Sequence, residues 1–350
     1  MTKIKINDKI IGDKNPCYTI AEAGANHDGE IKKAFKLIDG AIESKSDSVK
    51  FQTYKASKLT TKTAPKYWDD DKPNETQFDV FKKLDSLNND DWKQIFEYAN
   101  KKDITCFSTP FDKDSVDLLY SLDVPAFKIA SADITDIPLI KHIAAKQLPI
   151  FISTGMANDE EIRYAVNSIE DAGNHEIIIM HCITSYPTKP EDANLEMINT
   201  LHTQYPEYPI GFSDHTLGTL ISVFSTFYGA QCVEKHFTFD NSLKVSPDHK
   251  LSLNPKDFRI LVEQLRLSSI SKGSPQRNLF DAESEAVKYA RRSIVSSQKI
   301  PKNTVITEDM LDIKRPGTGI SPKFFEKVIG SITSNEIDED IPIQWTDLIN

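Results

Sequence analysis

The stretch YTIAEAGANHDGEIKKAFKLIDGAIESKSDSVKFQTY, Tyr18–Tyr54, decides the fold because it contains one complete strand–helix–strand unit. Tyr18–Gly24 and Val49–Tyr54 are apolar runs of the length of a buried strand. Ile31–Glu43 between them has the spacing of an amphipathic helix. Two strands joined through a crossover helix lie parallel, so this stretch predicts a parallel sheet whose strands alternate with helices.

The same unit recurs along the chain. The further expected strands are Ile104–Pro110, Ala126–Ser131, Pro149–Thr154, Ile177–Cys182, Pro209–His215 and Cys232–Phe237, with helical patterns between them such as Asp90–Lys101, Asp114–Leu122, Asp159–Asp171 and Leu217–Gly229. Eight such units within roughly 250 residues favour a closed (β/α)8 TIM barrel. An open doubly wound sheet is the alternative, but it calls for a Gly-rich phosphate loop, and neither GxGxxG nor GxxxxGK[ST] occurs in the sequence.

The chain extends beyond one barrel. Lys256–Ile270 is the expected last barrel helix, and Ser271–Asp281 has the composition of a linker. The βα alternation then stops, with a short strand expected at Ser293–Val295 and a short helix around Pro322–Val328. We therefore predict a barrel domain over residues 1–270, a linker over 271–285 and a small α/β domain over 286–350. The long polar connection Lys55–Asn89, which contains Trp68, Asp69 to Asp71 and Asn74, is typical of a functional loop or lid.

Composition limits the function classes. The 42 Lys and Arg against 52 Asp and Glu give a formal net charge of −10, which disfavours a nucleic-acid partner because such binding neutralises phosphates. No apolar run is long enough to span a membrane, and the N-terminal residues have no apolar signal core. The four cysteines form no CxxC pair, which indicates reduced thiols. We expect a cytoplasmic protein without a membrane partner.

Polar side chains gather where the expected strands end, and barrel enzymes hold their catalytic groups there. They are Glu22, Lys50 and Gln52, Ser108 and Thr109, Lys128, Ser131 and Asp133, Ser153, Thr184 and Tyr186, Ser213 and His215, and Glu234 and His236. A single lysine at such a place can be a solvated rim residue. Inward ammonium groups at Lys50 and Lys128 together are costly without an anion, so the pair favours an anion site. The hydroxyl groups would add neutral donors.

His215 and His236 end the seventh and eighth expected strands. Neutral imidazoles on neighbouring strands can share a divalent cation and leave positions open for water and substrate, although a single histidine is more often a satisfied structural residue. Mn²⁺, Zn²⁺ and Fe²⁺ are all compatible with two nitrogen ligands.

A series of motifs across nearly the whole chain resembles the sialic acid synthase family. They are IAEAGANHDG (Ile20–Gly29), KFQTY (Lys50–Tyr54), FSTPFD (Phe107–Asp112), FKIAS (Phe127–Ser131), STGMA (Ser153–Ala157), HCITSYPT (His181–Thr188), GFSDHTLG (Gly211–Gly218), EKHFT (Glu234–Thr238) and PDHKLSLNP (Pro247–Pro255). KRPGTGIS (Lys314–Ser321) resembles the antifreeze-like or SAF module. Each motif is weak by itself, and their order along the chain makes the resemblance specific.

The resemblance implies a metal-assisted, aldol-type condensation of phosphoenolpyruvate with N-acetylmannosamine or a related N-acetylated hexosamine, with release of phosphate. Members are typically domain-swapped homodimers that use a divalent metal, Mn²⁺ first among them. The implied metal ligands are His215 and His236. The implied catalytic residues are Glu22, Lys50, Lys128 and Asp133, and the implied substrate-binding residues are Gln52, Thr109, Ser131, Ser153, Thr184, Tyr186, Ser213, Asp248 and Arg315, the last from a partner subunit.

The sequence also departs from the family pattern. Ala132 and Asp133 stand where Gly-Glu is usual, Asp136 where Asn is expected, Thr184 where some relatives have Asn, and Ser246 where a glycine precedes the PDH motif. These differences bear on the acceptor sugar more than on the reaction. Two other classes remain open at this stage. One is a different metal-dependent barrel enzyme, such as an isomerase or hydrolase, and the other is a binding protein with a decayed site.

Overall fold

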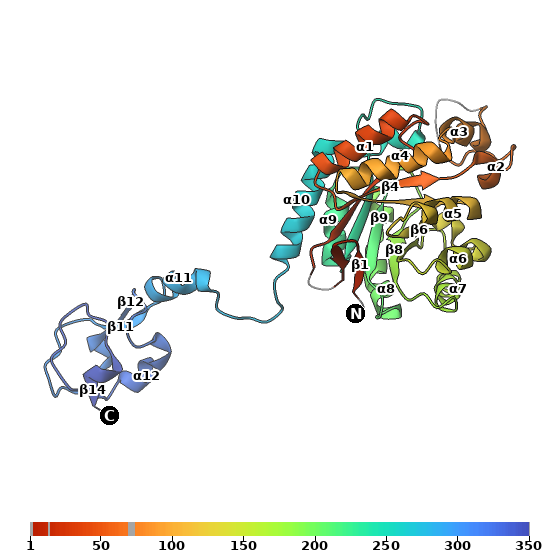
Figure 1. Ribbon diagram of the computed structural model, residues 1–350. Coiled ribbons are helices and arrows are strands. Elements are labelled where there is room, and N and C mark those ends of the chain that lie inside the picture. Colours follow the sequence, from red (N-terminus) through yellow and green to blue (C-terminus); the bar gives the residue numbers. More distant parts are fainter. Residues whose placement is uncertain (1–2, 13–14, 69–73, 350) are drawn as a thin grey trace. The chain divides into compact units, whose positions relative to one another are not determined.

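The computed structural model describes residues 3–12, 15–68 and 74–349, and the chain divides into two units, residues 1–273 and 274–350. The first unit is a closed barrel of parallel strands in the order β10-β3-β4-β5-β6-β7-β8-β9, which confirms the predicted (β/α)8 barrel (Figure 1). Its strands are β3 (Tyr18–Gly24), β4 (Ser48–Thr53), β5 (Thr105–Pro110), β6 (Phe127–Ile129), β7 (Ile150–Ser153), β8 (Ile177–Cys182), β9 (Ile210–Asp214) and β10 (Cys232–His236). Each lies within one residue or so of an expected run, except that β6 is shorter.

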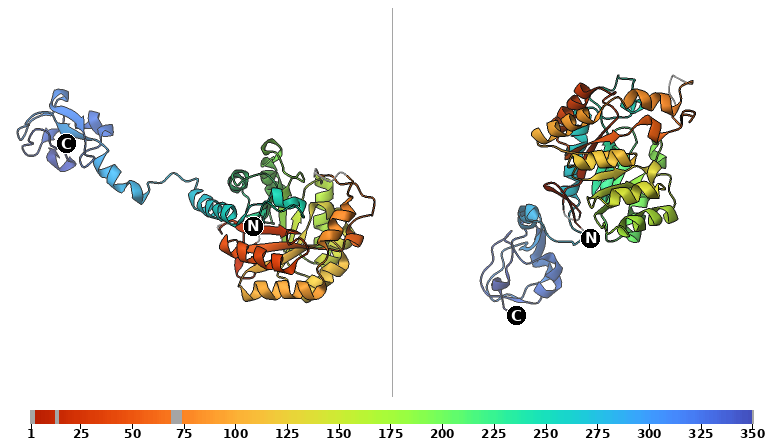
Figure 2. Two further views of the ribbon diagram at one scale, coloured as in Figure 1. Left: turned by 90° about the horizontal axis from the view of Figure 1, so that it is seen from above. Right: turned by 45° about the vertical axis from the view of Figure 1, so that its right-hand side comes forward.

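Helices surround the barrel on its outer side (Figure 2). They are α1 (Ile31–Glu43), α4 (Asn89–Lys101), α5 (Lys113–Ser121), α6 (Ile137–Ala144), α7 (Asp159–Glu170), α8 (Glu196–Gln204), α9 (Leu220–Phe227) and α10 (Pro255–Ser271). Asn88 and Asn158, which directly precede α4 and α7, each accept from two backbone N–H groups in a reciprocal capping box. The apolar stripes of these helices pack onto the strands in one large hydrophobic core.

An N-terminal hairpin packs against the residues that fill the barrel interior. β1 (Ile4–Ile6) and β2 (Lys9–Ile11) pair antiparallel, and Ile4, Ile6 and Ile11 are fully buried. These side chains form one cluster with Tyr18, Ile20, Phe107, Ala126, Phe151, Ile178, Met180 and Cys232 from the barrel strands. The sequence analysis did not identify this hairpin, although the alternating KIKI run carries its pattern.

The connection between β4 and α4 carries two short helices, α2 (Ala56–Leu59) and α3 (Gln77–Leu84). Val80 and Leu84 of α3 pack with Tyr54, while Trp68 and Phe81 pack against this cluster. Asp69 to Asp71, which were named for this loop, lie outside the described residues, and Asn74 is exposed.

The second unit has its own small core. β11 (Ser293–Ser296) pairs antiparallel with β12 (Leu311–Lys314), and β13 (Ile332–Thr333) pairs with β14 (Leu348–Ile349). The expected strand at Ser293–Val295 and helix around Pro322–Val328 are present, the latter as a 3-10 turn followed by α12 (Phe325–Val328). α11 (Ser284–Tyr289) precedes this core. In the part of the chain that the structure describes, no helix has the length and apolar character to cross a membrane.

The contribution of packing in the barrel interior to stability can be tested at the stacked rings of Phe107 and Phe151. Their centroids are 5.2 Å apart at an interplanar angle of 18°, and both side chains are fully buried. We predict that Phe151→Ala lowers the free energy of unfolding by about 3–5 kcal/mol, because it leaves a cavity between closed strands. Urea denaturation measures this, with Tyr164→Ala on the exposed face of α7 as the control; an equal loss in both variants would contradict the prediction.

Candidate active site

A cavity of about 530 Å³ opens at the carboxyl ends of the barrel strands. Fourteen of the fifteen residues predicted from sequence line it: Glu22, Lys50, Gln52, Thr109, Lys128, Ser131, Asp133, Ser153, Thr184, Tyr186, Ser213, His215, His236 and Asp248. The fifteenth, Arg315, is exposed on the second unit, in a loop whose Gly317 and Gly319 backbone N–H groups donate to Lys288 and Ser293. Ser108, also expected at a strand end, bonds to Thr53 and does not line the cavity.

Two lysines and two glutamates form a buried charge cluster in this cavity. Lys50 Nζ lies 2.7 Å from Glu22 Oε2 and 3.7 Å from Glu234 Oε2. Lys128 Nζ donates to both oxygens of Glu234, at 2.8 and 2.9 Å. The side chains of this cluster are 2–7% exposed. Around them, Thr109, Gln52 and Ser213 each bond to one member of the cluster.

The cluster changes the explanation of how the two buried lysines are stabilised. A bound anion was expected to offset their burial, but Glu22 and Glu234 already act as counter-ions. Glu234 is the residue that the predicted site omitted, although its spacing from His236 in the VEKH run places both on one face of β10. Glu22 pairs with Lys50, so this carboxylate has a structural partner inside the cavity.

The two carboxylates differ in their pKa values. Burial raises the pKa of Glu22 to about 7, with Lys50 opposing the shift and Glu234 adding to it. Burial also acts to raise the pKa of Glu234, but Lys128 and Lys50 outweigh it and lower that pKa to about 2. Near neutral pH the cluster therefore holds two ammonium groups against one full and one partial negative charge. The remaining positive charge favours an anionic ligand.

Hydroxyl groups at or just beyond the ends of β6, β7 and β8 are placed to bind such a ligand. Ser153 Oγ and Thr184 Oγ1 are buried without a hydrogen-bond partner among the described residues. Ser131 Oγ accepts from the backbone N–H of Gly155 at 3.0 Å. A side chain at Gly155 would lie 2.4 Å from Thr184 Oγ1 and 2.8 Å from Ser131 Oγ, which explains why the STGMA motif needs glycine there.

The two expected metal ligands lie side by side. The rings of His215 and His236 are 5.2 Å apart, and the ring of Tyr186 lies 4.3 Å from that of His215. His215 Nδ1 lies 2.9 Å from the Ile183 carbonyl, so that a proton on this nitrogen would leave Nε2 available as a ligand. His236 Nδ1 is buried without a hydrogen bond among the described residues, and burial keeps the pKa of His236 well below its usual range. This donor set fits a divalent cation, although no group of three or more His, Cys, Asp or Glu of the described residues gathers there.

A buried ion pair stands behind the histidines. Asp214 and Lys235, the chain neighbours of His215 and His236, pair at 2.8 Å with side chains no more than 1% exposed. Asp214 Oδ1 also accepts from the backbone N–H of Thr216, and Lys235 donates to the Thr216 carbonyl. Strand alternation sends these two side chains away from the cavity. The pair thereby joins the ends of β9 and β10 that carry the histidines.

The positions that depart from the family pattern have clear structural settings. Asp133 lies in a 3-10 turn after β6 with its Oδ2 buried and unbonded among the described residues. Asp136 caps α6, accepting from the Leu139 N–H at 3.1 Å. Ser246 has φ −80°, so this turn does not require the positive φ that a glycine would supply, and its hydroxyl accepts from the Asp248 N–H. Serine at this position therefore imposes no strain on the turn.

Aromatic side chains also line the cavity and were not predicted from the sequence. This aromatic wall comprises Tyr54, Tyr67, Trp68, Phe81 and Phe111, which are carried by the loop after β4, α3 and the loop after β5. Tyr54 contacts Phe81 and Phe111 edge to face. Burial raises the pKa values of Tyr54 and Tyr67, and Asp248 adds to both shifts. Asp248 lines the same cavity as these tyrosines.

Asp133 yields a pH-dependent prediction. Burial raises its pKa to about 7, with Asp136 adding to the shift. Between about pH 4 and 7 the folded chain holds a proton that the unfolded chain has lost, so this group's contribution to stability falls as the pH rises. We predict that Asp133→Asn gains on the order of 1–2 kcal/mol over the natural chain at about pH 8 and little at about pH 4. Urea denaturation at both pH values measures this, with exposed Asp171→Asn as the control; a pH-independent gain would contradict it.

Known protein families match most of the chain. The NeuB family matches residues 37–277, and the SAF domain matches residues 291–349. The N,N'-diacetyllegionaminic acid synthase of Legionella pneumophila is 37% identical, over 97% of each chain. The pseudaminic acid synthase of Helicobacter pylori is 32% identical, over 95% of this chain and 98% of that one. The crystal structure of the N-acetylneuraminic acid synthetase of Leptospira borgpetersenii, in complex with citrate, covers 82% of this chain and 95% of its own, with 32% identity and a TM-score of 0.72.

Proposed function

The chain belongs to the NeuB family, and from this premise we propose that its barrel condenses phosphoenolpyruvate with a 2,4-diacetamido hexose of the legionaminic type. At the level of the family, the protein is a nonulosonic acid synthase, a phosphoenolpyruvate-dependent transferase that acts on N-acetylated amino sugars and releases phosphate. The observation that carries this function is the buried Lys50–Lys128 cluster beside the histidine pair.

Phosphoenolpyruvate fits the cationic side of the cavity. Its carboxylate and phosphate carry the charge that Lys50 and Lys128 attract, and its oxygens would accept from Ser153 and Thr184. Ser131, Ser213 and Thr109 would complete the donors, and Glu234 would hold both lysines in place. Because Glu22 is only partly ionised near neutral pH, the approach of a further negative charge is not opposed by two full carboxylates.

A divalent metal held by His215 and His236, with Mn²⁺ the expected ion, would polarise the open-chain aldehyde of the sugar. The chain's own residues would do the rest. C3 of phosphoenolpyruvate forms the new bond to the aldehyde carbon while the electron pair of the C=O bond moves to the aldehyde oxygen, which takes up a proton. Water then adds to the cationic C2 and loses a proton, and the C2–O bond to phosphate breaks to leave the 2-keto acid and inorganic phosphate. Glu22, which Gln52 and Lys50 orient, can give or take a proton near neutral pH. Asp133 is the second candidate for this proton transfer.

The aromatic wall supports a legionaminic-type acceptor. A 2,4-diacetamido-6-deoxy hexose carries an acetamido group at C4, where N-acetylmannosamine carries a hydroxyl, and a methyl group at C6 in place of a hydroxymethyl group; it thus adds two methyl groups. Apolar rings of Trp68, Phe81 and Phe111 suit methyl groups, while the Asp248 carboxylate suits a sugar hydroxyl. The 37% identity to a diacetyllegionaminic acid synthase agrees with this choice.

The small domain and the oligomer belong to the same proposal. The family resemblance assigns Arg315 of one chain to the sugar site of its partner in a domain-swapped homodimer. Leu220, Phe224 and Phe227 lie on one face of α9 and are 45–59% exposed, and Leu267 and Ile270 are exposed on neighbouring α10. Exposed large apolar side chains at helical spacing suit a second copy of the chain. A cytoplasmic location and the absence of a nucleic-acid partner stay predictions, and the four cysteines are buried and free.

The reaction itself has a direct test. We predict phosphate release that requires both phosphoenolpyruvate and an N-acetylated hexosamine, and that a chelator abolishes and Mn²⁺ restores. No release with any sugar of a panel would contradict the synthase function. Release that continues in chelator would contradict the metal assignment alone.

The role of Arg315 has a separate test. A chain that ends near Ser271, and the full chain with Arg315→Ala, should both lose use of the sugar. Full activity in either variant would contradict the role of Arg315.

The acceptor preference has its own test. We predict that kcat/KM for the 2,4-diacetamido-6-deoxy hexose exceeds that for N-acetylmannosamine by roughly 10- to 200-fold, the range of one or two apolar contacts. Phe81→Ala should shrink this ratio, because it removes part of the wall. Phe35→Ala on α1, a ring stacked on Tyr98 outside the cavity, is the matched control. A ratio near one in the natural chain would contradict the proposed acceptor.

A further inference from the structure

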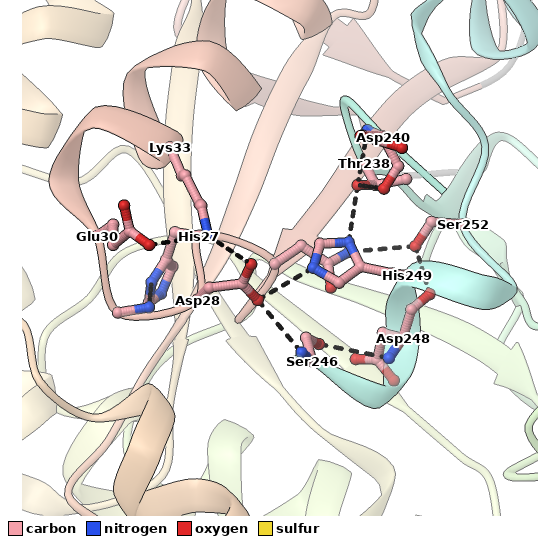
Figure 3. Close-up of polar contacts among 12 residues, drawn as sticks. His27, Asp28, Glu30, Lys33, Thr238, Asp240, Ser246, Asp248, His249 and Ser252 are labelled. Atoms are coloured by element: carbon pink, nitrogen blue, oxygen red, sulfur yellow. Dashed lines mark hydrogen bonds and ion pairs between the residues drawn. The ribbon is translucent and has the colours of Figure 1, made fainter. Parts of the chain in front are cut away.

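Two loops at the mouth of the barrel are joined by a buried pair, Asp28 and His249 (Figure 3). Asp28 belongs to the loop after β3, and His249 to the 3-10 turn Pro247–Lys250 after β10. His249 Nε2 lies 3.0 Å from Asp28 Oδ1, and the side chains are 0% and 1% exposed. Neither residue lines the cavity, whereas Asp248, the chain neighbour of His249, does.

The pair is satisfied on all sides. Asp28 Oδ1 also accepts from the Ser246 backbone N–H at 3.2 Å, and Oδ2 accepts from Lys33 Nζ at 2.9 Å. Hydrogen bonds and charges from His249 and Lys33 outweigh the effect of burial and lower the pKa of Asp28, so it is an ionised acceptor. His249 Nδ1 lies 2.8 Å from the Thr238 hydroxyl, and Nε2 then carries the proton toward Asp28. Both ring nitrogens thus have a fixed partner, and the imidazole has one defined orientation.

A second set of bonds holds the backbone of Asp248. Its N–H donates to Ser246 Oγ at 3.3 Å, and its carbonyl accepts from Ser252 Oγ at 2.7 Å. Ser252 Oγ in turn accepts from Asn26 Nδ2 at 3.1 Å. The loop after β3 therefore reaches the Asp248 turn at two points, through Asn26 and through Asp28. His249 directly follows Asp248 in the chain, so its contact with Asp28 holds the backbone next to Asp248.

We propose that Asp28 and His249 are positioning residues, which hold the Asp248 carboxylate in place for the acceptor sugar without touching it. The inference rests on the proposed function in one respect, the contact of Asp248 with the acceptor. A four-residue 3-10 turn has little stability of its own, so its place in the cavity depends on such tertiary bonds. The HDG and PDH motifs, about 220 residues apart in the chain, are joined for this purpose.

The test compares four single variants of the full chain in Mn²⁺. His249→Leu removes the donor to Asp28, and we expect the acceptor KM to rise about tenfold, the effect of losing a hydrogen bond to a charged group. The KM for phosphoenolpyruvate should stay within about twofold, since its donors lie on other loops. His249→Gln, whose amide can donate to Asp28, should recover most of the acceptor KM. Asp248→Asn should raise the acceptor KM at least as much as His249→Leu does.

The fourth variant is the structural control. His202→Leu removes a comparable imidazole bond, from Nε2 to the Gly229 carbonyl at 3.0 Å, near the amino end of β10 and outside the cavity. It should lower the midpoint of urea denaturation and leave both KM values unchanged. If His249→Leu behaves in the same way, or if Gln restores nothing, the positioning role is overturned.

A double variant shows whether the pair acts through Asp248. In the Asp248→Asn background, the added His249→Leu change should raise the acceptor KM by less than about twofold, because neighbours that act through one contact are not additive. A full tenfold rise in that background would overturn the inference. An acceptor KM unchanged by Asp248→Asn would instead refute the assigned contact of Asp248 in the proposed function, whereas an effect of Asp248→Asn with none of His249→Leu refutes the positioning role alone.

Discussion

Most of the site depends on one constraint, the placing of two lysine ammonium groups inside a closed barrel. Lys50 and Lys128 each project from a strand whose neighbours are apolar, where an unpaired charge is very costly. Glu234 lies within reach of both, and Glu22 pairs with Lys50. Glu22 and Lys50 lie on the consecutive, directly paired strands β3 and β4, whereas Glu234 of β10 comes within reach of the lysines because β10 closes against β3. Closure of the barrel therefore also brings the Glu234 carboxylate to the two lysines and balances part of their charge.

The two sides of the cavity differ in charge and polarity. The cluster side attracts negative charge, because its cations are only partly balanced near neutral pH. The aromatic side, built on α3 and the loops that follow β4 and β5, presents apolar rings, and the Asp248 carboxylate lines the same cavity. The histidine pair lines the same cavity. Phosphoenolpyruvate and a methyl-bearing amino sugar match the two sides in charge and polarity.

Residues behind the cavity set its geometry. The Asp214–Lys235 pair joins the strand ends that carry the two histidines, and the Asp28–His249 pair joins the loops after the first and last barrel strands. In each pair at least one member adjoins a cavity residue in the chain: Asp214, Lys235 and His249 do. Such bonds restrict side chains that a loop by itself would leave mobile. These buried pairs account for polar residues that do not line the cavity.

The sequence by itself determined the strand and helix periodicity, the barrel, the charge types at the strand ends and the family, because these depend on residue identity and short-range spacing. It could not pair Glu234 with Lys128, or Asp28 with His249, since each pair is more than one hundred residues apart in the chain. The aromatic wall and the N-terminal hairpin were likewise decided by tertiary packing, because an aromatic residue in a loop has no period that reveals its neighbour. Glu234 shows the limit most clearly: alternation placed it on the right face, and only the closed barrel made it the counter-ion of both lysines.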